Sequence, residues 1–333
     1  MIINKGAESK RPRPLRYIQP MESKYDFPSS LRYRNMRKLI YLMFLIALAA
    51  GCSGKQKEDT ARTSQQDSVE LLEMPQIPSE ITDPNQRADY LAVHFWDNMD
   101  FRDTLRSHNK EFIEQNFVNY TSILPYASDT LKVIDGFSAM LKKAEVDRKA
   151  YDLLMKTADS YLYDPNSPML NEDLYILYLR SVMQSDYLSS DEKVSPAYRL
   201  EQVSKNRPGM KAADFKFRTT DGKESTLMRS LPDHNLLLIF FDPECENCER
   251  IIGKLQEDPV LADNVASGNI SVLAVYPGEK EESWRKKAST MPKTWTIGIN
   301  DDIEDKELYY LPAMPIIYEI DKTGTVIQKD IQL

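Results

Sequence analysis

The fold of this chain is decided by the stretch LLLIFFDPECENCERIIGKL, residues 236–255. Six consecutive apolar residues at 236–241 predict a strand that is buried on both faces of a sheet. The apolar pattern within residues 251–255 predicts a helix directly afterwards. Two cysteines with the spacing CxxC, Cys245 and Cys248, lie where the predicted strand passes into the predicted helix.

This spacing suits disulfide exchange. Cys245 is expected at the helix N-terminus, where free backbone N–H groups and the helix dipole favour a thiolate. Cys248 follows one helical turn later and can close a disulfide with it. We therefore expect Cys245 to attack a substrate disulfide and Cys248 to resolve the mixed disulfide. Two structural thiols, or half of a zinc site, are the alternatives.

Zinc binding is disfavoured by the supply of ligands. The chain has three cysteines and three histidines, which makes a site of four zinc ligands hard to assemble. We expect no metal and no cofactor. The histidines are His94, His108 and His234. His94 lies among apolar residues and is expected to be a core histidine rather than a ligand.

The rest of the C-terminal third predicts further strands. Residues 270–276 (ISVLAVY) have the composition of a second buried strand, and residues 281–291 predict a helix after it. Residues 214–217 alternate polar and apolar side chains and lead to an Asp-Gly pair at 221–222, which predicts a hairpin. A second hairpin is expected within residues 313–327. Residues 206–333 are therefore predicted to form an α/β domain.

The middle of the chain, residues 83–205, predicts an N-terminal all-α helical domain, so that the fold class is α+β overall. Asp83 and Pro84 are an N-cap and first-turn signal. Apolar residues recur at helical spacing from Tyr151 to Leu162, and Asn171 is expected to cap a further helix. We assign the many aromatic residues to a helical core rather than to a binding groove. No catalytic constellation is found there.

The N-terminus carries an export signal. Residues 39–50 (LIYLMFLIALAA) form an apolar run that follows a basic stretch and is too short to span a bilayer. The run leads into LAAGC (48–52), which resembles the end of a bacterial lipoprotein signal and implies that Cys52 is diacylated. An ordinary signal peptide is the alternative. We assign residues 1–51 to the signal region and residues 52–82 to a flexible tether. Residues 1–35 are interpreted as a start-site artefact, because a complete leader begins directly after them.

Charge separates the leader from the rest of the chain. The 333 residues have a formal charge of −8. Residues 1–51 contain 10 Lys and Arg and 3 Asp and Glu, so the remaining 33 basic and 48 acidic residues carry −15. This acidity argues against a nucleic-acid partner. It also opposes binding to anionic lipid, so attachment to a membrane would depend on the lipid anchor.

The stretch RPGMKAADFKFRTTDGKESTL (207–227), together with FFDPECENC (240–248), resembles the TlpA-like thioredoxin domains. The leader and helical domain in front of it resemble a group of envelope lipoproteins that contain a helical domain of unknown function. The resemblance implies a thioredoxin-like fold and a thiol-disulfide oxidoreductase. It further implies a cis proline that faces the cysteine pair, for which Pro315, preceded by Met314, is the candidate substrate-binding element.

Two departures from the family pattern bear on the reaction. Ile239 stands where thioredoxin proper has a buried acid, which leaves the proton acceptor for Cys248 unassigned. Glutamates at 244, 246 and 249 surround the cysteine pair, and negative charge opposes formation of the Cys245 thiolate. We therefore expect the chain to work in the reductase or isomerase direction on protein or small thiol and disulfide substrates.

Two other functions remain open at this point. A peroxiredoxin-like peroxidase is disfavoured because Asp242 stands three residues before Cys245, where the peroxidatic motif has Thr. A non-catalytic envelope binding or scaffold lipoprotein would retain the fold without using the cysteines. The sequence does not identify the electron donor. The expected location is the cell envelope, with the chain anchored to a bacterial membrane and facing the periplasm or the outside.

Overall fold

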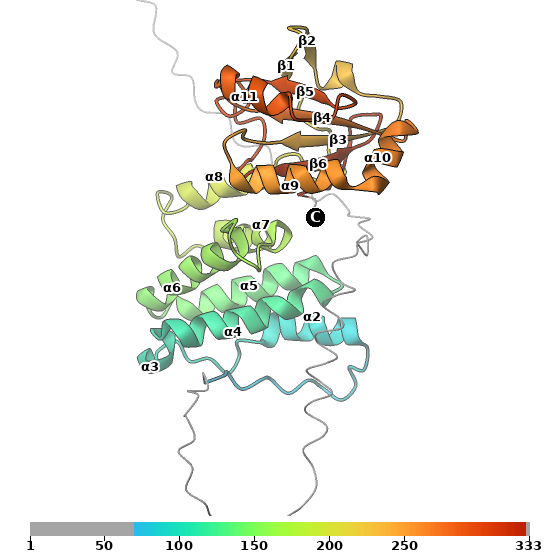
Figure 1. Cartoon of the computed structure of the whole chain (residues 1–333). Coiled ribbons are helices and arrows are strands. Elements are labelled where there is room, and N and C mark those ends of the chain that lie inside the picture. The colour runs from blue at the N-terminus through green and yellow to red at the C-terminus, as the bar shows by residue number, and fades with distance from the viewer. Residues whose placement is uncertain (1–69, 331–333) are drawn as a thin grey trace, which may run out of the picture. The chain divides into compact units, whose positions relative to one another are not determined.

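A computed structural model describes residues 70–330 of the chain, all within one compact unit that spans Asp67–Leu333. The predicted signal region, Cys52 and most of the predicted tether lie outside the described residues. The described chain has a mixed α/β structure in which helices precede a seven-stranded sheet (Figure 1). No helix between residues 70 and 330 is long and apolar enough to cross a membrane.

The first part of the described chain contains helices only. They are α2 (Pro84–His94), α3 (Thr104–Ser107), α4 (Lys110–Ile123), α5 (Thr130–Ala144), α6 (Arg148–Ala158), α7 (Glu172–Gln184) and α8 (Val194–Val203), with short turns η1 (Leu124–Tyr126) and η2 (Asp159–Tyr163). The predicted start signals are confirmed: Asp83 caps α2, and the Asn171 side chain accepts the N–H of Leu174 at 3.1 Å in α7. Whether residues 83–205 form a domain of their own stays a prediction.

Aromatic side chains fill the core of the helical segment, as predicted. Tyr120, Phe137 and Tyr178 are fully buried, and the Phe137 ring meets each of the two tyrosines edge-on at 5.6 and 5.4 Å between centroids. Offset and edge-on contacts of this kind stabilise a core beyond simple burial of area. The aromatic residues of this segment therefore hold its helices together.

The prediction for His94 was wrong. Its side chain is 38% exposed and its Nδ1 lies 2.7 Å from the Asp97 carboxylate. Helix α2 buries Ala88 and Ala92, four residues apart, so a residue two positions beyond Ala92 lies off that face. The ring instead stacks on Tyr90 at 4.3 Å between centroids.

The sheet has the strand order β2-β1-β5-β4-β3-β6-β7. Its strands are β1 (Lys216–Thr219), β2 (Glu224–Thr226), β3 (Asn235–Phe240), β4 (Ile270–Tyr276), β5 (Thr296–Ile299), β6 (Ile316–Ile320) and β7 (Val326–Lys329). The neighbours β3–β4 and β4–β5 are parallel, and the other pairs are antiparallel. Both predicted buried strands and both predicted hairpins are present, whereas β5 was not predicted.

Side chains on the two faces of β3 enter separate cores. Leu237 and Ile239 pack with residues of α9 (Glu246–Glu257), and Leu236 and Leu238 pack on the opposite face with β1 and the 303–311 region. Helices α10 (Pro259–Ala266) and α11 (Glu281–Ala288) complete the segment, and η3 (Met228–Ser230) follows β2. The predicted helix 281–291 therefore ends earlier than expected. Burial on both faces explains why β3 is apolar throughout.

Candidate active site

Cys245 lies where β3 leads into α9, as predicted from the sequence. It is the N-cap residue of α9, and its Sγ accepts the backbone N–H of Cys248 at 3.3 Å. The same sulfur donates to the main-chain carbonyl of Met314 at 3.6 Å. An N–H donor and the positive end of a helix both stabilise a sulfur that carries negative charge. The Cys245 side chain is half-buried, so this sulfur retains access to solvent.

Cys248 has the opposite environment, one turn into the helix. It is fully buried, in one apolar cluster with Ile239 and Ile252. Burial raises the pKa of the Cys248 thiol to about 12. The backbone N–H of Asp242 donates to its Sγ at 3.4 Å, an interaction that acts against this shift. The pair therefore combines one accessible sulfur with one that is shielded and protonated at neutral pH.

This asymmetry predicts the order in which the two thiols react with an alkylating agent. At pH 8 a thiol with a pKa of about 12 is ionised in about one molecule in ten thousand. Of the two cysteines in the pair, iodoacetamide should therefore modify only Cys245 in the folded chain at pH 8, and Cys248 should begin to react only as the pH rises toward 12. Mass spectrometry of proteolytic peptides checks this. In the urea-unfolded control both cysteines should react, and equal labelling of both in the folded chain would contradict the assignment.

The segment before β6 completes the site. The Met314–Pro315 peptide bond is cis, as the family resemblance implies. The Met314 carbonyl accepts a hydrogen bond from the Cys245 thiol and a second one from the side-chain Nδ2 of Asn247 at 3.3 Å. The structure thus brings together Cys245, Cys248, Met314 and Pro315. Cys245 and Met314, which are in contact, are separated by 69 residues along the chain. Their catalytic roles stay predictions.

Lysines near the cysteine pair were missed by the sequence analysis. Lys280 and the Ser283 hydroxyl bond to the Glu244 carboxylate, and the Lys280 contact keeps the pKa of that carboxyl below its usual range. Lys287 lies 3.5 Å from Glu249. These cations reduce the negative charge that the sequence analysis placed around Cys245. The signal that could have found them is the pair of predicted buried strands. Because β3 and β4 are parallel neighbours, the loops that follow them meet at one edge of the sheet.

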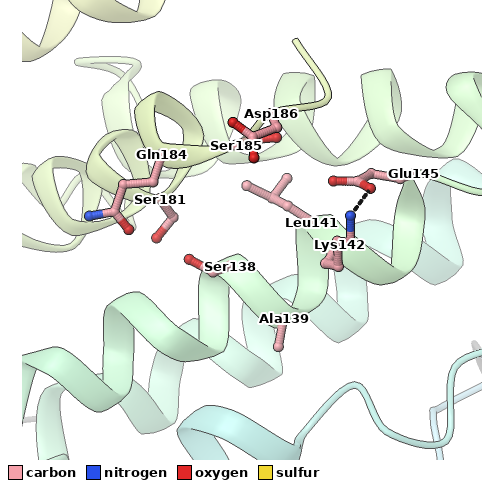
Figure 2. Close-up of a pocket in the computed structure, with 9 residues that line it drawn as sticks. All are labelled: Ser138, Ala139, Leu141, Lys142, Glu145, Ser181, Gln184, Ser185 and Asp186. Carbon is pink, nitrogen blue, oxygen red and sulfur yellow. Dashed lines mark hydrogen bonds and ion pairs between the residues drawn. The ribbon is translucent and has the colours of Figure 1, made fainter.

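A hollow lies in the helical segment, and none of the predicted site residues lines it (Figure 2). It has a volume of about 420 Å³ and lies between α5 and α7, with an ion pair of Lys142 and Glu145 at 2.6 Å on its rim. Its lining residues are Ser138, Ala139, Leu141, Lys142, Glu145, Ser181, Gln184, Ser185 and Asp186. Across residues 70–330, no group of three or more His, Cys, Asp and Glu side chains is arranged to hold a metal ion.

Comparison with known proteins places the chain in a family. A family model described as a domain of unknown function, DUF5106, matches residues 51–206. The crystal structure of a thioredoxin-like protein from Bacteroides caccae is 36% identical and covers 80% of this chain and 96% of its own, with a TM-score of 0.73. The chain belongs to the thioredoxin-like proteins. No functionally curated protein matches this thioredoxin-like chain in sequence.

Other solved structures match a smaller share of this thioredoxin-like protein. A conserved protein of unknown function from Bacteroides fragilis is 40% identical and covers 38% of this chain and 93% of its own, with a TM-score of 0.37. The thioredoxin domain of a thiol-disulfide oxidoreductase from Bacteroides vulgatus is 19% identical and covers 38% of this chain and 89% of its own, with a TM-score of 0.32.

Proposed function

We propose that this thioredoxin-like protein is an envelope thiol-disulfide oxidoreductase of the TlpA-like type, in which Cys245 is the nucleophile and Cys248 the resolving thiol. The observation that carries the proposal is the position of Cys245 at the N-terminus of α9. Its sulfur accepts a backbone N–H at 3.3 Å beside the carbonyl that precedes Pro315. Cys248 lies buried one turn away. A peroxidase or a scaffold would not require this pairing of a half-buried and a fully buried thiol.

The reaction proceeds through two exchanges of sulfur. The Cys245 thiolate attacks one sulfur of a substrate disulfide, forms a mixed disulfide, and releases the other substrate sulfur as a thiol after protonation. Cys248 then attacks the Cys245 sulfur, and the second substrate sulfur leaves with the proton that Cys248 gives up. Two electrons pass from the chain to the substrate, and Cys245 and Cys248 end as a disulfide. A dithiol electron donor, not yet identified, must reduce that disulfide before the next cycle.

The helix and the buried thiol favour different steps. The N–H from Cys248 and the helix dipole support the Cys245 thiolate before attack. The shielded Cys248 stays protonated at neutral pH, so Cys245 rather than Cys248 attacks the substrate disulfide. We expect protein or small disulfides as substrates.

The direction of the reaction is tested by the reduction potential of the pair. Of the three glutamates that flank the cysteine pair, Glu244 and Glu249 each contact a lysine. The third, Glu246, is not part of this lysine pairing. Enough negative charge remains for us to expect a reductase or isomerase, with a potential between about −270 and −180 mV. Equilibration with graded dithiothreitol or glutathione couples, followed by alkylation and mass spectrometry, measures it. A value near −120 mV would contradict this direction, and failure to form a Cys245–Cys248 disulfide would overturn the proposed function.

The proposed location depends on Cys52. With a diacyl anchor on this residue, the protein should sediment with membranes and resist extraction by salt, since two acyl chains give stable attachment. Cys52→Ser should move it to the soluble fraction of the envelope, because the remaining chain carries −15 and gains nothing from anionic headgroups. Fractionation with immunodetection checks this, with Cys245→Ser as the matched cysteine control. Membrane retention of a Cys52 variant from which residues 1–51 have been removed would rule out the lipid anchor.

A further inference from the structure

The segment that carries Met314 and Pro315 begins with a turn, residues 300–308, whose conformation depends on contacts with other parts of the chain. Within it, the side chain of Asn300 accepts the N–H of Ile303 at 2.7 Å, and the N–H of Leu308 donates to the carbonyl of Ile303 at 3.1 Å. Glu307 closes this turn with φ +48°, in the left-handed region that favours glycine. A glutamate persists in this conformation only where neighbouring groups hold it.

Those neighbouring groups come from helix α8 and from the residues directly after it. The Tyr198 hydroxyl donates to one carboxylate oxygen of Glu307 at 3.0 Å, and the Gln202 amide donates to the other at 2.8 Å. The Lys205 ammonium lies 3.5 Å from the second oxygen. Tyr198 and Gln202 lie four residues apart on one face of α8, and Lys205 follows two residues after its end, so the three donors converge on one carboxylate. Their contacts, led by the Gln202 hydrogen bond, lower the pKa of Glu307.

The residues after Glu307 are held by the same part of the chain. The Leu308 carbonyl accepts the Asn206 amide at 2.8 Å. The Tyr310 ring stacks on Tyr163 of η2, with centroids 5.9 Å apart and planes 11° apart. Tyr309, between them, is buried in the core of the sheet. Residues 307, 308 and 310 therefore contact the helices or Asn206, whereas Tyr309 enters the core of the sheet, and Tyr310 lies four residues before Met314.

We propose that helix α8 is an anchor that positions the loop of Met314 and Pro315 against Cys245, and that Glu307 is its positioning residue. The inference rests on the proposed oxidoreductase function, since it assigns the helical segment a part in that reaction. The Met314 carbonyl accepts the Cys245 thiol at 3.6 Å. A modest displacement of the loop removes that contact and changes the surface against which a substrate chain binds beside Cys245.

Three variants separate positioning from simple stabilisation. Glu307→Ala removes the carboxylate while leaving a non-glycine residue at φ +48°. Glu307→Gln keeps side-chain oxygen and can still accept a hydrogen bond from α8. Glu304→Ala, on the same turn, is the matched control, because no side-chain interaction of Glu304 is found among the described residues.

Kinetics are measured with insulin as a protein disulfide and with 5,5′-dithiobis-(2-nitrobenzoate) as a small one. Hydrogen exchange of the Leu308 amide reports on the turn itself.

Positioning predicts a specific pattern. Glu307→Ala should lower kcat/KM for insulin about tenfold, mainly through KM, and leave the reaction of Cys245 with the small disulfide unchanged. Exchange at Leu308 should quicken, Glu307→Gln should recover most of the loss, and Glu304→Ala should match the original chain. Equal insulin kinetics in Glu307→Ala, or unchanged exchange at Leu308, would overturn the anchor alone. A chain that reduces neither disulfide before any substitution would overturn the proposed function and the anchor's catalytic role together.

Discussion

Cys248→Ser should convert this protein into a trap that holds its substrate covalently. The variant keeps Cys245 at the helix N-terminus, where the sulfur can still attack a disulfide. It lacks the buried thiol that would release the mixed disulfide. With insulin as the substrate, non-reducing electrophoresis should show an adduct that disappears on addition of dithiothreitol. Peptide mapping should locate the linkage at Cys245.

The matched control is Cys245→Ser, which should form no adduct. Its rate of disulfide reduction should fall about 1000-fold or more, because the covalent nucleophile is lost. Cys248 cannot substitute for it, because this thiol is fully buried and protonated at neutral pH. If both serine variants form adducts equally, or neither does, the division of roles between the two cysteines is wrong. The trap can then be used in the envelope to identify natural substrates.

The second large effect concerns stability and a buried ion pair. The Lys329 side chain at the end of β7 is only 3% exposed, and its ammonium contacts both oxygens of Glu172, the first residue of α7, at 2.7 and 3.0 Å. Burial lowers the pKa of Lys329. Glu172→Gln leaves this cation buried without its counterion, and should reduce the free energy of unfolding by about 3–5 kcal/mol. Urea denaturation measures the loss.

Two further variants test the cause of that loss. Lys329→Met removes the buried cation while Glu172 keeps its partner Arg207 at 2.9 Å, so the change in stability should stay within about 1 kcal/mol. Glu201→Gln is the surface control: its carboxylate is 68% exposed and 3.9 Å from Lys205, and its loss should cost less than about 1 kcal/mol. If Glu172→Gln is no more destabilising than Glu201→Gln, the buried pair contributes little to stability.

The strands that carry the site could be predicted from the sequence because each left a local signal. β3 and β4 are apolar runs whose side chains are buried, and the cysteine spacing placed Cys245 at a helix start. Strand β5, Thr296–Ile299, has four residues and no long apolar run, so nothing local distinguished it from a loop. It is stabilised by pairing with β4 and β1, which depends on residues distant in sequence.

The surroundings of the cysteine pair were harder to predict for the same reason. Lys280 contacts Glu244 across 36 residues, and Glu307 contacts Tyr198 across 109. Neither pair has a spacing that a helix or strand period would produce. His94 was misassigned because its apolar neighbours suggested burial, whereas its orientation on α2 is set by which face packs.

Catalysis of insulin reduction tests the central claim most directly, namely that the Cys245–Cys248 pair exchanges disulfides. With dithiothreitol as the electron donor, the purified chain should shorten the lag before reduced insulin precipitates, and Cys245→Ser should match dithiothreitol alone. An unsubstituted chain that reduces insulin no faster than dithiothreitol alone, or a Cys245→Ser variant that is as fast as the original, would contradict the account.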